Sequence, residues 1–148
     1  MALSFRFATE EDVAVISAIE ADTMSNPWKA QDYLEAIHSD HAFIAVAVND
    51  AELVAFGVFY LTPPEAELPD IVVKKDFRGQ GIGKALLTYA LDVLKNEKVD
   101  TVFLEVRVSN ARAQGLYISL GFEEIGKRKY FYSNPTEDAI CMSLHMGD

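Results

Sequence analysis

A glycine-rich turn between a short apolar run and a long amphipathic segment constrains the fold of this chain most strongly. Residues 71–73 have the composition of a buried strand, and the residues from about Gly83 onward have helical periodicity. Glycines at positions 79, 81 and 83 leave little side-chain bulk over the backbone N–H groups of the turn. The start of a helix adds unpaired donors and a positive dipole end. The turn is therefore predicted to hold an anion such as a phosphate or pyrophosphate.

Spacing excludes two kinds of phosphate-binding loop. A Walker loop would need a glycine at position 78 and a hydroxyl residue at position 85, where this chain has Arg78 and Ala85. A dinucleotide fingerprint would need its third glycine at Lys84 or Leu86. The motif Arg78-Gly79-Gln80-Gly81-Ile82-Gly83 instead resembles the Q/R-x-x-G-x-G/A acetyl-CoA loop of the GNAT N-acetyltransferases. An ordinary glycine-rich connection between a strand and a helix remains the alternative.

Composition bounds the class of protein. The 148 residues, half of them hydrophobic, are expected to form one domain over residues 1–148. The chain has no apolar run of about 18 residues and no signal-peptide pattern, so a soluble cytoplasmic protein without membrane contact is expected. A net charge of −10 argues against nucleic-acid binding. That charge is compatible with a cationic substrate, although solubility alone can also explain it.

Apolar patterns predict an order of β-α-α-β-β-β-α-β-α-β-β. Strands are expected over residues 3–7, 42–48, 53–61, 68–73, 101–108, 123–130 and 139–145. The strand, helix and strand between residues 68 and 108 predict a parallel pair, because a crossover helix joins them. The expected fold class is α/β, in the α+β sense of a mixed sheet between helices.

Capping residues place the four helices of this pattern. Thr9 and Asp12 form a capping pair for the first helix. Asn26-Pro27 supplies a cap and a first-turn proline for the second. The apolar members expected in that second helix are Trp28, Leu34 and Ile37. The third helix begins near position 83, and a fourth, capped by Ser109 or Asn110, is expected to end at position 121.

The second half of the chain extends the family resemblance. Residues 104–122, LEVRVSNARAQGLYISLGF, are similar to the L-E-V-R-x-S-N-x-x-A-x-x-L-Y-x-x-x-G-F run of the RimI-type ribosomal-protein-alanine N-acetyltransferases. The tail EDAICMSL resembles their E-D-A-I-x-M-x-L ending, and Asn26-Pro27-Trp28 fits their first-loop signature. The resemblance implies a GNAT-like fold, in which a parallel strand pair splays to admit acetyl-CoA. It also implies acetyl transfer to the N-terminal α-amino group of a protein such as a ribosomal protein.

Two residues are candidates for catalysis. Glu105 places a carboxylate in an apolar strand, which is costly unless the group is paired or used. An ion pair with Arg107 on the same strand face is one explanation; beside an acyl-CoA site, a general base acting directly or through water is the other. Tyr117 could be a core aromatic. The resemblance implies that it protonates the departing CoA thiolate.

The resemblance also assigns residues to acetyl-CoA. The backbone of three strand residues would contact the pantetheine arm: Ile71, Val72 and Val73. The turn would cradle the pyrophosphate, through Arg78, Gly79, Gln80, Gly81, Ile82, Gly83 and Lys84. Asn110 would both cap a helix and contact the CoA arm, and Tyr117 would line the same site. No metal is expected, because His38 and His41 have no third ligand nearby in the sequence.

Departures from the family pattern concern the acceptor. The chain has Pro69-Asp70 where the RimI-type pattern has Leu-Asn, and Tyr130-Phe131-Tyr132 where a tyrosine pair is usual. Two other functions therefore stay open. The chain could acetylate a small amine, such as a polyamine, an amino acid or an amino sugar, or it could bind an acyl-CoA without catalysis. Retention of Glu105 and Tyr117 argues against the non-catalytic alternative.

Overall fold

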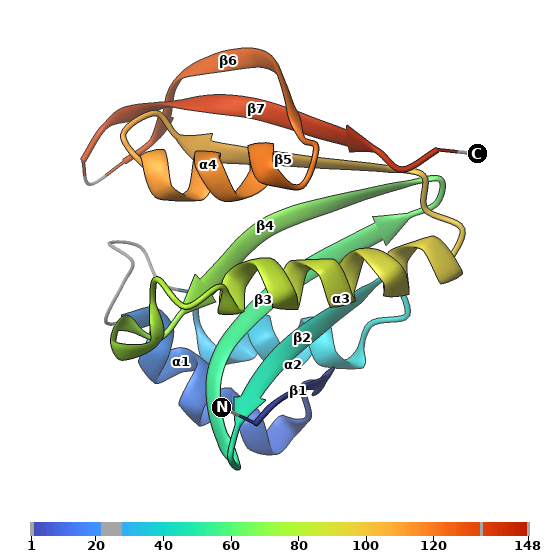
Figure 1. The fold of residues 1–148 in the computed structure, drawn as a ribbon, viewed down its shortest axis with the longest axis vertical. Coiled ribbons are helices and arrows are strands. Elements are labelled where there is room, and N and C mark those ends of the chain that lie inside the picture. The colour runs from blue at the N-terminus through green and yellow to red at the C-terminus, as the bar shows by residue number, and fades with distance from the viewer. Residues whose placement is uncertain (1, 22–27, 134, 148) are drawn as a thin grey trace.

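The computed structural model describes residues 2–21, 28–133 and 135–147 (Figure 1). The strands and helices follow the predicted order. Their bounds are β1 Leu3–Phe7, α1 Val13–Ala21, α2 Ala30–His38, β2 Ala42–Asn49, β3 Glu52–Thr62, β4 Glu65–Val73, α3 Ile82–Asn96, β5 Thr101–Arg107, α4 Ala111–Ser119, β6 Glu123–Tyr132 and β7 Glu137–His145. Short 3-10 turns at 10–12 and 75–77 precede α1 and α3. Among the described helices, none has the length and apolar character needed to cross a membrane.

The strands form one seven-stranded sheet in the order β1-β2-β3-β4-β5-β7-β6. Neighbouring strands are antiparallel except for β4 and β5, which are parallel as predicted. Helices cover both faces, with α3 and α4 on the near side of Figure 1 and α1 and α2 behind the sheet. Each layer buries its own apolar cluster against the sheet. We call the two sides the α3 face and the α1 face.

The second helix begins later than predicted. The expected cap at Asn26-Pro27 lies outside the described residues. Lys29 is the N-cap of α2, and its N–H donates to the carboxylate of Asp32 over 3.0 Å. Trp28 therefore precedes the helix and is not one of its members, which corrects the prediction. The other two predicted members, Leu34 and Ile37, lie in α2 and pack half-buried against the same apolar cluster as its buried residues Tyr33 and Ala36.

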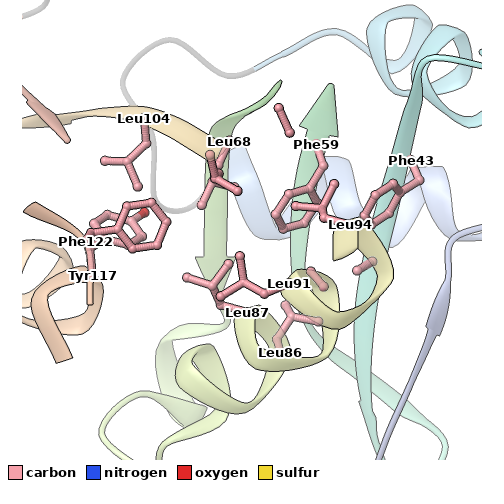
Figure 2. Packing of buried hydrophobic residues seen from close by; sticks show 14 of the residues in the cluster. Phe43, Phe59, Leu68, Leu86, Leu87, Leu91, Leu94, Leu104, Tyr117 and Phe122 are labelled. Atoms are coloured by element: carbon pink, nitrogen blue, oxygen red, sulfur yellow. The ribbon is translucent and has the colours of Figure 1, made fainter. Parts of the chain in front are cut away.

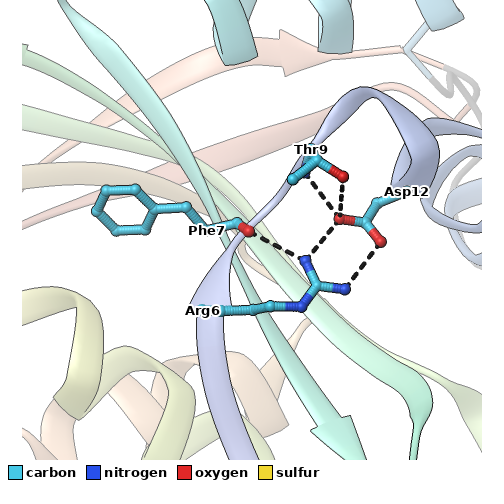
Figure 3. Close-up of polar contacts among 4 residues, drawn as sticks. All are labelled: Arg6, Phe7, Thr9 and Asp12. Atoms are coloured by element: carbon cyan, nitrogen blue, oxygen red, sulfur yellow. Dashed lines mark hydrogen bonds and ion pairs between the residues drawn. The ribbon is translucent and has the colours of Figure 1, made fainter.

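The first helix begins as its capping pair predicts (Figure 3). The carboxylate of Asp12 accepts hydrogen bonds from the Thr9 N–H over 2.8 Å and from both terminal nitrogens of Arg6, over 2.7 and 3.0 Å. The hydrogen bond from Arg6 is the main reason that the pKa of Asp12 lies below its ordinary value. This cluster joins the end of β1 to the first layer of helices.

A β-bulge interrupts β4. Tyr60 of β3 lies opposite Glu67, whereas Val58, two residues earlier, lies opposite Asp70. β4 therefore has one more residue than β3 between these two pairs. Pro69 lies within this stretch, and a bulge tolerates a residue without an N–H better than a regular ladder does.

The bulge coincides with the point where β4 and β5 separate. The two strands are paired only over Glu65–Glu67 and Thr101–Phe103, and beyond that they diverge (Figure 1). Across the bulge the strand also changes the direction of its side chains, since Leu68 packs on the α3 face and Val72 on the α1 face. The predicted splay of the parallel pair is thus confirmed.

Apolar side chains fill the α3 face on both sides of the split. Figure 2 shows Leu68 of β4 and Leu87 of α3 on one side, facing Leu104, Tyr117 and Phe122 on the other. All five are buried. The packing holds α3 and α4 against the sheet at the place where the strands separate.

Candidate active site

The glycine turn has the backbone conformation that its sequence predicts. Gly79 and Gly81 have φ angles of 79° and 78°, in the left-handed region that favours glycine. Gly81 is the N-cap of α3. A Cβ atom added at either position would meet no other atom within 4 Å, so the turn is open on the outside. The strain of a side chain here would come from the backbone rather than from a clash.

Backbone donors gather at this turn. The hydrogen bond from the Ala85 N–H to the Gly81 carbonyl, 3.1 Å long, is the first of α3. The N–H groups of Ile82, Gly83 and Lys84 precede it in the first turn, where a helix has no acceptor for them. These donors and the helix dipole suit the phosphate groups of a nucleotide.

The side chains of the turn differ in their contacts and in their exposure. The Nε atom of Arg78 donates to the Val73 carbonyl over 3.1 Å, which ties the turn to the end of β4. Ile82 is 1% exposed and belongs to the core, so only its backbone can contribute to binding. Gln80 and Lys84 are exposed. Of the side chains predicted at the pyrophosphate, Lys84 thus offers an exposed positive charge beside the first turn.

Gly83 lies between the start of α3, the end of β4 and α4. A Cβ atom here would lie 3.4 Å from Val73 Cγ2 and 3.5 Å from Leu116 Cδ2, which is ordinary van der Waals contact. Packing alone therefore does not require glycine at this position.

One edge of β4 is available to a ligand. Residues 71–73 pair with β3, whose Ala55, Phe56 and Gly57 lie opposite them. On the other side, pairing with β5 has already ended at Glu67. An open strand edge can pair with an extended ligand through backbone hydrogen bonds. The contact between the backbone of Ile71, Val72 and Val73 and the pantetheine arm stays a prediction, for which this edge leaves the strand unpaired on one side.

Tyr117 and Asn110 lie on the far side of the split. Tyr117 is 6% exposed and packs against Phe122, with ring centroids 5.6 Å apart. Asn110 is the N-cap of α4, and its Oδ1 accepts a hydrogen bond from the Ala113 N–H over 3.1 Å. The capping role predicted for Asn110 is confirmed.

Glu105 has a different ion partner from the one considered in the sequence. Its Oε1 lies 3.8 Å from an Arg128 guanidinium nitrogen, and the Glu105 side chain is 31% exposed. Arg107 donates to the carbonyl oxygens of Ser133 and Pro135 and lies over the ring of Tyr132 at 4.5 Å. Among the described residues, the ion pair of Glu105 is therefore with Arg128. A long contact to an exposed guanidinium contributes little stability.

Glu105 opens into a pocket of about 220 Å³. We call this cavity the Glu105 pocket. Its lining comes from β4, β5 and β6, through Glu67, Leu68, Pro69, Glu105, Phe131 and Tyr132. The bulge in β4 places Pro69 there. Irregular pairing of β6 between Arg128 and Tyr132, with Tyr130 at a φ of 55°, places the two aromatic rings of the wall.

The two catalytic candidates lie on opposite faces of the sheet. Leu104 packs in the same cluster as Tyr117 on the α3 face. Successive strand residues point to opposite faces, so Glu105 points to the α1 face. The burial of β5 alternates as predicted from the sequence. Pairing between β4 and β5 ends at Glu67 and Phe103, two residues before Glu105 on β5.

Glu67 and Arg128 were not predicted as site residues, whereas Phe131 and Tyr132 were connected with the acceptor through the family's tyrosine pair. Glu67, Phe131 and Tyr132 line the Glu105 pocket, and Arg128 pairs with its carboxylate. Charged and apolar residues alternate over residues 65–68, and this pattern could have placed Glu67 on the same face of the sheet as Glu105. The two aromatic residues are placed by the irregular pairing of β6, which no local pattern in the sequence reveals.

Comparison with known proteins assigns the family. The acetyltransferase (GNAT) family profile matches residues 13–122. The chain is 35% identical to the [ribosomal protein bS18]-alanine N-acetyltransferase of Escherichia coli K12, over 90% of each chain. It is 33% identical to the N-alpha-acetyltransferase RimI of Mycobacterium tuberculosis, over 95% of this chain and 90% of that protein.

Solved structures agree with this assignment. The crystal structure of the ribosomal-protein-S18-alanine N-acetyltransferase from Escherichia coli superposes with a TM-score of 0.91 at 31% identity, covering 99% of this chain and 96% of that one. A chain of the NatC complex bound to Gag peptide and CoA has the same fold, with a TM-score of 0.87 at 24% identity, covering 99% of this chain and all of that one. The split sheet, the glycine turn and these relatives together show that the chain belongs to the GNAT acetyltransferase family and is an N-acetyltransferase.

Proposed function

We propose that this enzyme transfers the acetyl group of acetyl-CoA to the N-terminal α-amino group of a protein, with a ribosomal protein that begins with alanine as the acceptor class. The observation that carries the proposal is identity of 33–35% over at least 90% of the chain to enzymes named for that reaction. The glycine turn and the open edge of β4 supply the donors that acetyl-CoA would need.

The position of Glu105 and Tyr117 on opposite faces of the sheet supports separate roles for them, one as proton acceptor and the other as proton donor. On the α1 face, Glu105 would accept a proton from the acceptor ammonium, directly or through water. An α-amino group has a pKa of about 8, so only modest assistance is needed near neutral pH. The free amine would then form the new C–N bond while the C–S bond of the thioester breaks. On the α3 face, Tyr117 would donate its phenolic proton to the leaving thiolate. The proton that the new amide nitrogen then loses would restore the phenol, directly or through water.

The Glu105 pocket has room for a chain terminus. Pockets for drug-sized molecules measure about 300–1,000 Å³. A cavity of about 220 Å³ can take one small terminal residue while the rest of the acceptor lies outside. Phe131 and Tyr132 would contact that residue, since their rings form one wall of the cavity.

Acetyl transfer to two pools of acceptors tests the proposal. One pool contains peptides with free alanine or serine N-termini, each paired with the same peptide blocked at its N-terminus. The other contains polyamines, amino acids and amino sugars. We expect turnover of the free peptides only. Turnover restricted to a small amine would refute the proposed acceptor while leaving the family assignment intact.

A further inference from the structure

A second cavity lies on the α1 face. It measures about 250 Å³ and is lined by Trp28, Asp32, Glu35 and Tyr60. We call it the Trp28 pocket. Its lining combines two aromatic rings with two carboxylates. None of these four residues belongs to the glycine turn or lines the Glu105 pocket.

A buried carboxylate holds the aromatic side of the pocket in place. Glu20 is 1% exposed, and its Oε1 accepts hydrogen bonds from the Trp28 N–H, over 2.5 Å, and from the Tyr33 hydroxyl. The Trp28 ring stacks on Tyr33 at 5.5 Å and on Tyr60 at 6.3 Å between centroids. Trp28 is thus fixed both through its backbone and through its ring. This is a preorganised wall rather than a surface side chain that happens to lie nearby.

The carboxylates of the pocket lack cationic partners. Among the described residues, neither Asp32 nor Glu35 forms an ion pair. Burial of the Tyr60 ring, followed by the charges of Asp32 and Glu35, raises the pKa of the Tyr60 hydroxyl above its ordinary value. Two carboxylates without a cationic side chain in the described part of the chain, in one pocket with two aromatic rings, are the groups that bind a guanidinium or an ammonium.

The Trp28 pocket lies next to the Glu105 pocket. Tyr60 is the pairing partner of Glu67, and Glu67 lines the Glu105 pocket. Glu67 pairs with Phe103, which lies two residues before Glu105 on β5. Two strand spacings of about 4.8 Å and two residues of about 3.4 Å put Tyr60 about 12 Å or more from Glu105. An extended peptide advances about 3.4 Å per residue, so about the fourth residue of an acceptor whose N-terminus lies at Glu105 would come near Tyr60 and Trp28.

We propose that the Trp28 pocket binds an arginine or lysine side chain of the acceptor, about three residues after the acetylated one. The proposal rests on the proposed function, since it takes the peptide N-terminus to lie at Glu105. It names a specificity site, in which the cation contacts the aromatic rings and the carboxylates that line the pocket.

Binding can be measured without turnover, because Trp28 is the single tryptophan of the chain. Fluorescence titrations would use N-terminally acetylated peptides with one arginine moved along their second to sixth positions, each matched by its citrulline analogue. We expect arginine at about the fourth position to bind about tenfold more tightly than citrulline, as a cation–π contact with two carboxylates would allow. Equal binding of each matched pair would overturn the proposal.

Exposed carboxylates allow variants that keep the fold. Glu35→Gln and Asp32→Asn, alone and combined, should lose most of the preference for arginine over citrulline. Asp92→Asn removes the same charge from the exposed side of α3 and should leave the preference unchanged. An unchanged preference in the combined variant would also overturn the proposal.

The transfer assay separates this inference from the proposed function. Wild-type enzyme should have a lower KM for free peptides with arginine at the preferred position, whereas the KM of an alanine dipeptide that cannot reach the pocket should not respond to Glu35→Gln. If arginine-specific binding is found but no peptide N-terminus is acetylated, the cation site stands and the proposed function fails. If peptides are acetylated without any arginine preference, the reverse holds.

Discussion

The two sides of the split sheet are built from different chemical groups. On the side proposed for the acetyl donor, the unpaired edge of β4 at residues 71–73 and the first turn of α3 offer backbone N–H groups, and Gly79 and Gly81 leave the turn open. On the acceptor side, side chains from β4, β5 and β6 line the Glu105 pocket, and α2 and β3 add the Trp28 pocket. A backbone site changes little when exposed residues are substituted. A site of side chains can change its ligand one substitution at a time, so the proposal assigns specificity to the side that would bind the acceptor.

The largest effect expected from this division is that of Tyr117→Phe. The ring would still pack against Phe122, so the affinity for acetyl-CoA should stay within about twofold. Loss of the acid should lower kcat by about 100-fold, within the range found for general acids. Steady-state kinetics and calorimetric titration with acetyl-CoA provide the two measurements. Tyr89→Phe, on a half-buried ring of α3 that stacks on Phe5, is the control. Unchanged turnover of Tyr117→Phe would remove the acid role.

Glu105→Gln probes the opposite face. Without a base, transfer should depend on acceptor that is already deprotonated, so the loss of kcat/KM should be largest below the α-amino pKa of about 8 and should shrink above it. We expect kcat/KM to fall by about 30- to 100-fold at neutral pH, which is in the range found for a general base. Measuring kcat/KM at a series of pH values from 6 to 10 gives this profile.

Arg128→Gln is the matched variant for Glu105. It removes the ion-pair partner at 3.8 Å but keeps the carboxylate, so the wild-type pH profile should persist. If Glu105→Gln also keeps that profile, the carboxylate serves the ion pair and not the reaction.

Gly81→Val probes the backbone side. A β-branched residue at a φ of 78° is strained, although no atom stands in its way. The turn should therefore lose its shape, and acetyl-CoA should bind at least about tenfold more weakly. Gly81→Asn should bind nearly as wild type, because asparagine tolerates the left-handed region. Normal binding by the valine variant in calorimetry would contradict our account of the turn.

The smallest expected effect is on the stability of the first helix, which packs on the α1 face. Asp12→Asn removes the charge that joins Arg6 to the first helix, and should lower the free energy of unfolding by about 1 kcal/mol at pH 7. The pKa of Asp12 is lowered in the folded protein, so its contribution is present above the unfolded pKa of about 4 and is lost as the pH falls through the folded pKa. Urea titrations at pH 7 and pH 3 should show the difference shrinking at pH 3. An equal difference at both pH values would contradict the charged interaction.

The same division explains what the sequence could predict. The donor turn is local, so its glycines and the following helix predict both its conformation and its position. Alternation alone predicts the direction of Glu105, because β5 is regular throughout its length. The order of elements follows from periodicity and caps, and a crossover helix makes β4 and β5 parallel.

Features that depend on pairing between strands distant in the sequence could not be predicted from the sequence. Arg128 meets Glu105 only because β6 joins the sheet beside β7, and Phe131 enters the pocket through irregular pairing. The bulge at Pro69 changes strand register through contacts with β3. Trp28 was assigned to a helix since its neighbours suggest one, whereas contacts with Glu20, Tyr33 and Tyr60 hold it outside.

The most direct test of the central claim is to locate the transferred acetyl group. A peptide with a free N-terminal alanine and an internal lysine would be incubated with enzyme and acetyl-CoA, then fragmented in a mass spectrometer. The account predicts a single acetyl group on the α-amino nitrogen of the alanine. Acetylation of the lysine side chain in its place, or of neither amine, would contradict it.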